Sequence, residues 1–179
     1  MDSRKFLVPG ADLSDVNLSD ADLSGLDLSR TTWERANLSM ANLTDVILIN
    51  ANLSNANLLG ANLTNVNLSG ANLSDANLSY VILSFSKLDN ANLSRANLTK
   101  ASLVMADADH VHDDLSMTGA NLAGANLTGA TLWLADLTNA NLLNANLTDA
   151  DLTGVNLTNA TLDNANLAGA IMPDGTIHE

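Results

Sequence analysis

The chain of 179 residues contains no cysteine, so it can form no disulfide and offers no thiolate for catalysis or metal binding. Aromatic residues are scarce: there are two tryptophans, two phenylalanines and one tyrosine. A hydrophobic core must therefore be built mainly from leucine and alanine. The two prolines and ten glycines are too few for a disordered linker protein. The length and composition suit a single folded domain.

Long apolar runs are also missing, because none approaches the ~18 residues that a membrane span requires. The first ten residues, MDSRKFLVPG, include no apolar stretch of signal-peptide length. We therefore expect no membrane span and a cytoplasmic location. A location in the periplasm or the thylakoid lumen would follow if a leader was removed.

Positive charge is absent from the C-terminal part of the chain. All seven lysines and arginines lie at or before Lys100, whereas residues 101–179 contain ten acidic residues. The formal net charge is −13. Such a surface repels nucleic acid and anionic membranes, so we expect no direct nucleic-acid binding. The charge could attract a basic partner, although solubility is the simpler interpretation.

A leucine returns every fifth residue, as in ANLSNANLLGANLTNVNLSGANLSDANL, residues 51–78. Units of five run from Ala11 to His110 and again from Leu115 to Gly169, and 28 of the 31 unit centres are leucine. The residue two before the centre is alanine in 22 units, and the residue one before it is Asn or Asp in 23. A period of five fits neither an α-helix nor a regular strand.

The pattern nevertheless has a physical meaning. On an extended backbone, residues two apart point the same way, so Ala and Leu face one side while Asn faces the other. The two residues that follow each leucine, such as Ser-Asn or Thr-Gly, favour a turn. Each unit is therefore a very short strand and a corner, and the repeat predicts a coil with an apolar axis, stacked into a solenoid.

The motif A-(N/D)-L-(S/T)-x resembles the pentapeptide repeat family over nearly the whole chain. The ending MPDGTIHE also resembles the tails of cyanobacterial members. The resemblance implies an all-β fold, a right-handed quadrilateral β-helix of about eight coils with four five-residue sides and little or no α-helix. At ~4.8 Å per coil, the rod would be roughly 35 to 40 Å long. Residues twenty apart would stack, so that one column would hold Asn17, Asn37, Asn57, Asn77 and Asn97, with hydrogen bonds between their amides or to nearby backbone.

We expect a single pentapeptide-repeat domain over residues 1–179. Its parts are array one (11–110), a register break (111–114), array two (115–174) and short terminal segments (1–10 and 175–179). The break is either a shortened side or a bulge. At the ends, the apolar residues Phe6, Val8, Met172 and Ile177 could plug the core, and open strand edges could support an end-to-end homodimer.

Two irregularities need a structural explanation. Trp33 replaces a leucine, so either the coil widens there or the indole turns outward. The stretch ADADHVHDDL could hold a divalent metal through its histidines and aspartates, although a polar surface kink is the simpler interpretation. The candidate ligands there are Asp107, Asp109, His110, His112, Asp113 and Asp114.

The sequence shows no catalytic constellation, cofactor motif or established metal site. We therefore predict that the protein is not an enzyme and binds no cofactor. A small-molecule ligand is also unlikely, because a regular solenoid has no pocket. Function is then expected on the surface, and clustered apolar residues that point outward mark a candidate partner patch. That patch comprises Tyr80, Ile82, Phe85, Val104 and Met105. Other outward apolar residues are Ile47, Ile49, Leu59, Trp133, Leu134 and Leu143.

We therefore favour an interaction or regulatory scaffold that binds an unidentified protein partner. The alternative is a DNA mimic that inhibits DNA gyrase or another DNA-binding protein, because some relatives in the family imitate duplex DNA. This chain departs from that pattern, since its outward positions are mainly uncharged Asn and Ser. A purely structural role is the third reading.

Overall fold

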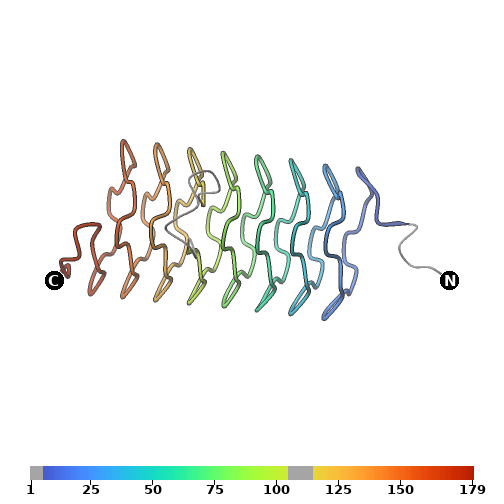
Figure 1. Cartoon of the computed structure of the whole chain (residues 1–179), viewed down its shortest axis with the longest axis horizontal. Coiled ribbons are helices and arrows are strands. Elements are labelled where there is room, and N and C mark those ends of the chain that lie inside the picture. The colour runs from blue at the N-terminus through green and yellow to red at the C-terminus, as the bar shows by residue number, and fades with distance from the viewer. Residues whose placement is uncertain (1–5, 105–114) are drawn as a thin grey trace.

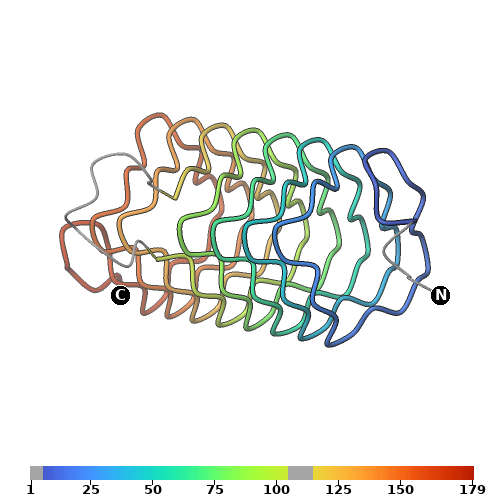
Figure 2. The same cartoon turned by 45° about the vertical axis from the view of Figure 1, so that its right-hand side comes forward.

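The chain is a right-handed β-helix whose coils stack into a rod, with the two termini at opposite ends (Figure 1). This computed structural model describes residues 6–104 and 115–179. Seen at an angle, each coil is a loop laid face to face on the next (Figure 2). The described residues form no α-helix and no continuous strand, since their pairing consists of isolated bridges of single residues. No helix there is long and apolar enough to cross a membrane.

Parallel bridges join residues that are twenty apart in sequence, beginning with Asp12 and Thr32. The backbone pattern is the same at each side: Leu38 N–H donates to Asn57 O at 2.8 Å, and Asn57 N–H donates to Ala36 O at 2.9 Å. Each side ends at a residue with positive φ, near 60°, such as Met40. Glycine, asparagine and aspartate tolerate that conformation best, which explains why they dominate the corners.

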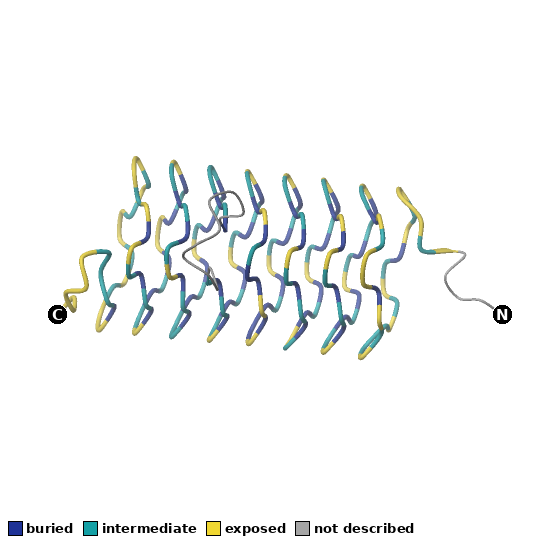
Figure 3. Cartoon of the chain, viewed as in Figure 1, coloured by how far each residue is buried: buried dark blue, intermediate teal, exposed yellow. Residues whose placement is uncertain are grey.

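The core is the continuous axis of the rod (Figure 3). Leucines at the unit centres and alanines or valines two residues earlier are buried through the middle coils, for example Leu73 and Ala71 at 0% exposure. One large and one small side chain per side fill the narrow axis without voids or overpacking. The inward positions predicted from the sequence are therefore confirmed.

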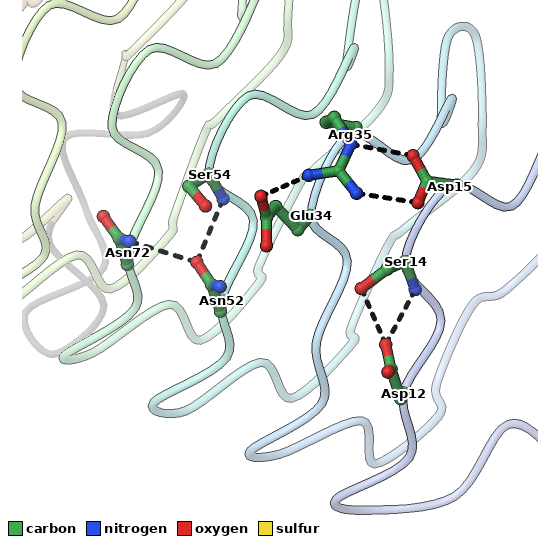
Figure 4. A network of polar contacts seen from close by, with 8 residues as sticks. All are labelled: Asp12, Ser14, Asp15, Glu34, Arg35, Asn52, Ser54 and Asn72. Carbon is green, nitrogen blue, oxygen red and sulfur yellow. Dashed lines mark hydrogen bonds and ion pairs between the residues drawn. The ribbon is translucent and has the colours of Figure 1, made fainter.

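Asparagines stack in columns along the outside, as predicted. In the column of Asn17, each Nδ2 donates to the Oδ1 of the coil before, at 3.0 Å from Asn37 to Asn17 and from Asn57 to Asn37. The same oxygen also accepts the backbone N–H two residues later, as from Ser39 to Asn37 at 3.2 Å. Figure 4 shows both bonds at Asn52, which accepts from Ser54 N and Asn72 Nδ2. Each amide thus stabilises its own turn and the contact between coils.

Several aspartates have a carboxyl pKa below the ordinary value because their oxygens accept hydrogen bonds or face an arginine. The Ser14 hydroxyl and amide lower the pKa of Asp12, and the bond from Arg35 lowers the pKa of Asp15. At Asp136, burial raises the pKa, but hydrogen bonds from Thr138, Thr118 and Asn156 together lower it further than burial raises it. The full set is Asp12, Asp15, Asp27, Asp75, Asp136 and Asp174.

These shifts predict loss of stability in acid. The unfolded carboxyls titrate near pKa ~3.9, above the folded values, so the folded state binds fewer protons. The stabilisation is therefore fully present above about pH 4 and is lost as pH falls through the folded pKa values. We expect a thermal unfolding midpoint that is flat from pH 7 to 5 and falls below about pH 4. Asp136→Asn keeps the acceptor oxygen and should make the acid limb shallower. A midpoint that rises on acidification, through relief of self-repulsion, would contradict this expectation.

Trp33 lies inside the rod, at 0% exposure. Its Nε1 donates to the hydroxyl of Thr31 at 2.7 Å, and that hydroxyl donates in turn to Leu28 O. The coil therefore accepts the indole with its polar atom paired, and an outward indole is excluded.

The terminal apolar residues mostly fail to plug the core. Phe6, Val8 and Ile177 are exposed, at 73%, 49% and 70%, so the prediction is wrong for them. Beyond the last stacked coil these side chains have no neighbouring coil to pack against. Only Met172 packs, partly buried, against the core. Nearby the tail folds back, with Ile171 and Ile177 in an antiparallel bridge.

The register steps once along the rod. Lys87 bridges Ser116, and Ser102 bridges Thr131, so bridged residues are here 29 apart instead of 20. Nine residues beyond the regular spacing therefore separate the two parts of the ladder. The two alternatives for the break at 111–114, a shortened side or a bulge, both stay predictions. Residues 105–114 themselves lie outside the described residues.

Candidate protein-interaction surface

An apolar strip crosses three successive coils on one side of the rod. We call Tyr80, Ile82, Phe85, Val104, Trp133 and Leu134 the side strip. Four of these come from the predicted patch, and its fifth member, Met105, lies outside the described residues. Bridges from Ile82 to Ser102 and from Ser102 to Thr131 set the alignment, which places Val104 opposite Trp133. The structure thus joins two groups that looked separate in sequence.

The strip is accessible. Tyr80, Ile82 and Trp133 are exposed at 55%, 44% and 44%, and the other three members are partly buried. A partner could therefore remove substantial apolar area from water, at about 25 cal/mol for each Å².

Most positions of the strip hold polar residues or glycine in the other coils, although Met40 lies in the column of Tyr80 and Ile171 in that of Ile82. The column of Ile82 holds Asp22, Asn42 and Asn62 in the preceding coils, and Asn42 Nδ2 donates there to Asp22 Oδ1 at 3.0 Å. The isoleucine side chain has no polar atom. It can therefore neither donate to the coil before it nor accept the backbone N–H two residues later, as asparagine does at this position. The chain therefore gives up local hydrogen bonds at Ile82 without any gain in the core.

Three strip members also occupy unfavourable corners. Tyr80, Phe85 and Leu134 have φ of 59°, 62° and 61°. Large side chains seldom adopt this conformation, which costs roughly 1–2 kcal/mol per residue. Leu134 has room only because Gly154 lies beside it, where an added Cβ would come within 2.5 Å of Leu134 Cδ2. Folding alone does not account for these residues.

Positive charge accompanies the strip. Lys100 Nζ lies 5.8 Å from the centroid of the Tyr80 ring, within the range of a cation–π contact. Lys87 is exposed close to Phe85 in sequence. The Arg95 guanidinium, on another corner, is already engaged by Asp75, with Nη2 and Oδ2 at 2.5 Å.

Among the other exposed apolar residues, Ile47 and Leu143 lie on other sides of the rod, whereas Leu59 and Met40 lie on the side of Tyr80, in the two coils before it. Ile47, Leu59 and Leu143 are exposed at 39%, 39% and 36%, as predicted. Met40 is exposed at 62% and was missed, because it follows Ser39 as an ordinary corner residue and only its size distinguishes it. Its Sδ would lie 2.6 Å from a Cβ at Gly60.

The proposed metal ligands, Asp107 to Asp114, lie outside the described residues. Within residues 6–104 and 115–179, no three His, Asp or Glu side chains come together to hold a metal ion.

A family model described as "Pentapeptide repeats" matches eight copies over residues 11–48, 48–79, 76–112, 116–154 and 150–174. Solved structures also resemble the chain. A trypsin-treated variant of QnrB1, a plasmid-mediated fluoroquinolone resistance protein, is 24% identical, with a TM-score of 0.65 over 93% of this chain and 86% of that one. This likeness supports the fold alone.

HetL, a pentapeptide repeat protein involved in heterocyst differentiation regulation from the cyanobacterium Nostoc sp. strain PCC 7120, is 32% identical. The matched region covers 93% of this chain and 87% of the HetL chain, with a TM-score of 0.34. A pentapeptide repeat protein from the Arabidopsis thaliana thylakoid lumen is 29% identical over 73% of this chain and 70% of its own, with a TM-score of 0.41. A comparison with curated proteins finds no significant match.

Proposed function

The chain belongs to the pentapeptide repeat family, and from that premise we propose that it is a non-catalytic scaffold that binds another protein through the side strip. One observation carries the proposal: apolar residues replace the usual polar ones on the same side of three consecutive coils. Tyrosine and tryptophan are enriched among the residues that dominate binding energy at protein interfaces. A stiff rod also presents such a strip without a cost for ordering it.

We infer further that each coil is four-sided and that about eight coils make up one domain over residues 1–179. Four bridge positions in every twenty residues support this geometry. An end-to-end homodimer is a separate proposal, which the acidic residues at both ends disfavour.

DNA mimicry of the kind that inhibits DNA gyrase is the second candidate. The rod shape and the net charge of −13 favour it. Neutral amides in the Asn17 column and the pairing of Asp15 with Arg35 reduce the resemblance to regularly spaced phosphates. Unchanged supercoiling by gyrase at micromolar protein would dispose of this candidate.

Affinity capture from an extract of the source organism tests the scaffold function. The strip variant should carry residue types found at the same position of the five-residue unit elsewhere in the rod: Tyr80→Asn, Ile82→Asn, Phe85→Asn, Val104→Thr, Trp133→Thr and Leu134→Asn. We expect native protein to retain a partner that this variant loses. A control variant with Ile47→Asn and Leu143→Thr, two exposed residues on other sides of the rod, should retain it.

Circular dichroism must first show that both variants keep the β-helix signal. Capture of the same partner by the native protein and the strip variant would contradict the assignment of the strip. Loss from both variants would place the interface outside it.

A further inference from the structure

We propose that the open N-terminal end of the rod is a second binding site, which takes an extended segment of another protein carrying apolar side chains between lysines or arginines. The site lies in the first coil, residues 11–30, away from the side strip. It would bind by adding a strand to the last unpaired edge of the β-helix.

The first element of the site is an apolar hollow of about 460 Å³. Core residues of the first coil line it, together with the residues just before that coil: Phe6, Leu7, Leu13, Val16, Leu18, Ala21 and Leu23, with Asn17 and Asp22 at its edge. Leu18 is only partly buried here, whereas Leu38, at the same position one coil later, is 1% exposed. The volume falls in the range of about 300–1,000 Å³ typical of ligand sites.

The second element is a free backbone edge. One coil later, Thr32 N–H donates to Ala11 O at 2.9 Å and Asn37 N–H donates to Val16 O at 2.8 Å. At Asp12, Asn17 and Asp27 the corresponding N–H groups have no backbone acceptor in the described chain. These three residues lie on different sides of the coil, so an added strand would follow one side and supply the acceptor there, with alternate side chains pointing into the hollow.

The opposite end of the rod shows that such an edge accepts a strand. There the tail pairs with the preceding side, since His178 N–H donates to Ala170 O and Gly169 N–H donates to His178 O, both at 2.9 Å. That edge is thus partly covered by the chain itself, and among the described residues the first coil is the more open of the two.

The third element is charge. The first coil carries Asp12, Asp15, Asp20, Asp22 and Asp27 against Arg30, a net charge of −4. In later coils the amide Nδ2 of an asparagine donates to the coil before it. A residue of the first coil has no coil before it, so an aspartate carboxylate can accept the hydrogen bonds of its own turn as well as an asparagine could. Asp12 shows this, since it accepts from Ser14 N at 3.0 Å and Ser14 Oγ at 2.6 Å (Figure 4).

This charge selects the occupant. Residues 149–179, at the other end, contain five acidic residues and no lysine or arginine. A second copy would therefore meet like charge whichever end it presented. A strand with outward lysines would instead place its cations near Asp12 and Asp20, since Asp15 is already paired with Arg35, while its apolar side chains enter the hollow.

The probe for the test is the blocked peptide acetyl-Lys-Leu-Lys-Leu-Lys-amide, titrated into the full chain with amide shifts followed by NMR. We expect the largest shifts within residues 11–30. The same peptide N-methylated at both leucines keeps its carbonyl acceptors, but its methyl groups replace two N–H donors and obstruct close strand pairing. It should bind about tenfold more weakly, a difference of ~1.4 kcal/mol. The paired variant Asp12→Asn and Asp27→Asn should also weaken binding, while Asp149→Asn and Asp151→Asn should not.

Equal binding of both peptides, or shifts spread over all acidic surfaces, would overturn the proposal in favour of non-specific attraction. Concentration-dependent dimerisation without peptide binding would overturn it in favour of a second copy. The strip variant should bind the peptide like native protein, so failure here and failure of the scaffold function remain distinguishable.

Discussion

Replacement of Trp33 by alanine is expected to lower the free energy of unfolding by about 3–5 kcal/mol, the range for large-to-small changes in a core. The side chain is fully buried, and no neighbouring group can refill the axis, because each coil is held to its neighbours by backbone bonds such as Trp33 N to Asn52 O at 2.6 Å. Urea unfolding followed by circular dichroism measures the loss.

The matched control restores the ordinary repeat. The double change Trp33→Leu and Thr31→Ala puts the common Ala and Leu pair into this side, and should cost less than about 1.5 kcal/mol because it keeps a well-filled axis. A cost below about 1 kcal/mol for Trp33→Ala would contradict the buried indole.

Replacement of Trp133 by threonine is expected to weaken binding of the captured partner about 30-fold, or ~2 kcal/mol, as for an interface residue that dominates the binding energy. The unfolding midpoint should not fall, because threonine already occupies the equivalent positions 44, 64 and 153. Affinity is measured by calorimetric titration of the purified partner into native and variant protein.

Leu143→Thr is the control for Trp133, since Leu143 is similarly exposed at 36% but lies outside the side strip. Its effect on affinity should stay within about twofold. Equal losses for both substitutions, or none for Trp133→Thr, would show that the strip is not the interface. In the Trp133→Thr protein the remaining indole, Trp33, should resist quenching by acrylamide.

The two tryptophans show which parts of the structure can be predicted from the sequence and which cannot. The five-residue period correctly predicts which positions face inward, because extended backbone fixes the alternation of side chains. The asparagine columns, whose members are twenty apart, follow instead from the family resemblance, because a period of five does not fix the number of sides in a coil. The period also cannot decide the orientation of Trp33, because the answer depends on whether Thr31 is small enough and polar enough to receive the indole.

The side strip is only half predictable for a related reason. Tyr80, Ile82, Phe85 and Val104 could be grouped by counting fives within one array. The position of Trp133 opposite Val104 depends on how the chain continues between the arrays, and residues 111–114 fit no unit of five. The ends are the other weak point, because periodicity cannot say where stacking stops and leaves Phe6 exposed.

The nine-residue step determines which side of the second half of the rod is aligned with which side of the first. With two more sides between the bridged halves, Val104 would face Ala123 in place of Trp133. Adding or removing a single side there would therefore rotate a whole set of surface residues without changing a single one of them. In such a rod, new surfaces can arise from the number of sides alone, while every coil on either half keeps its own packing.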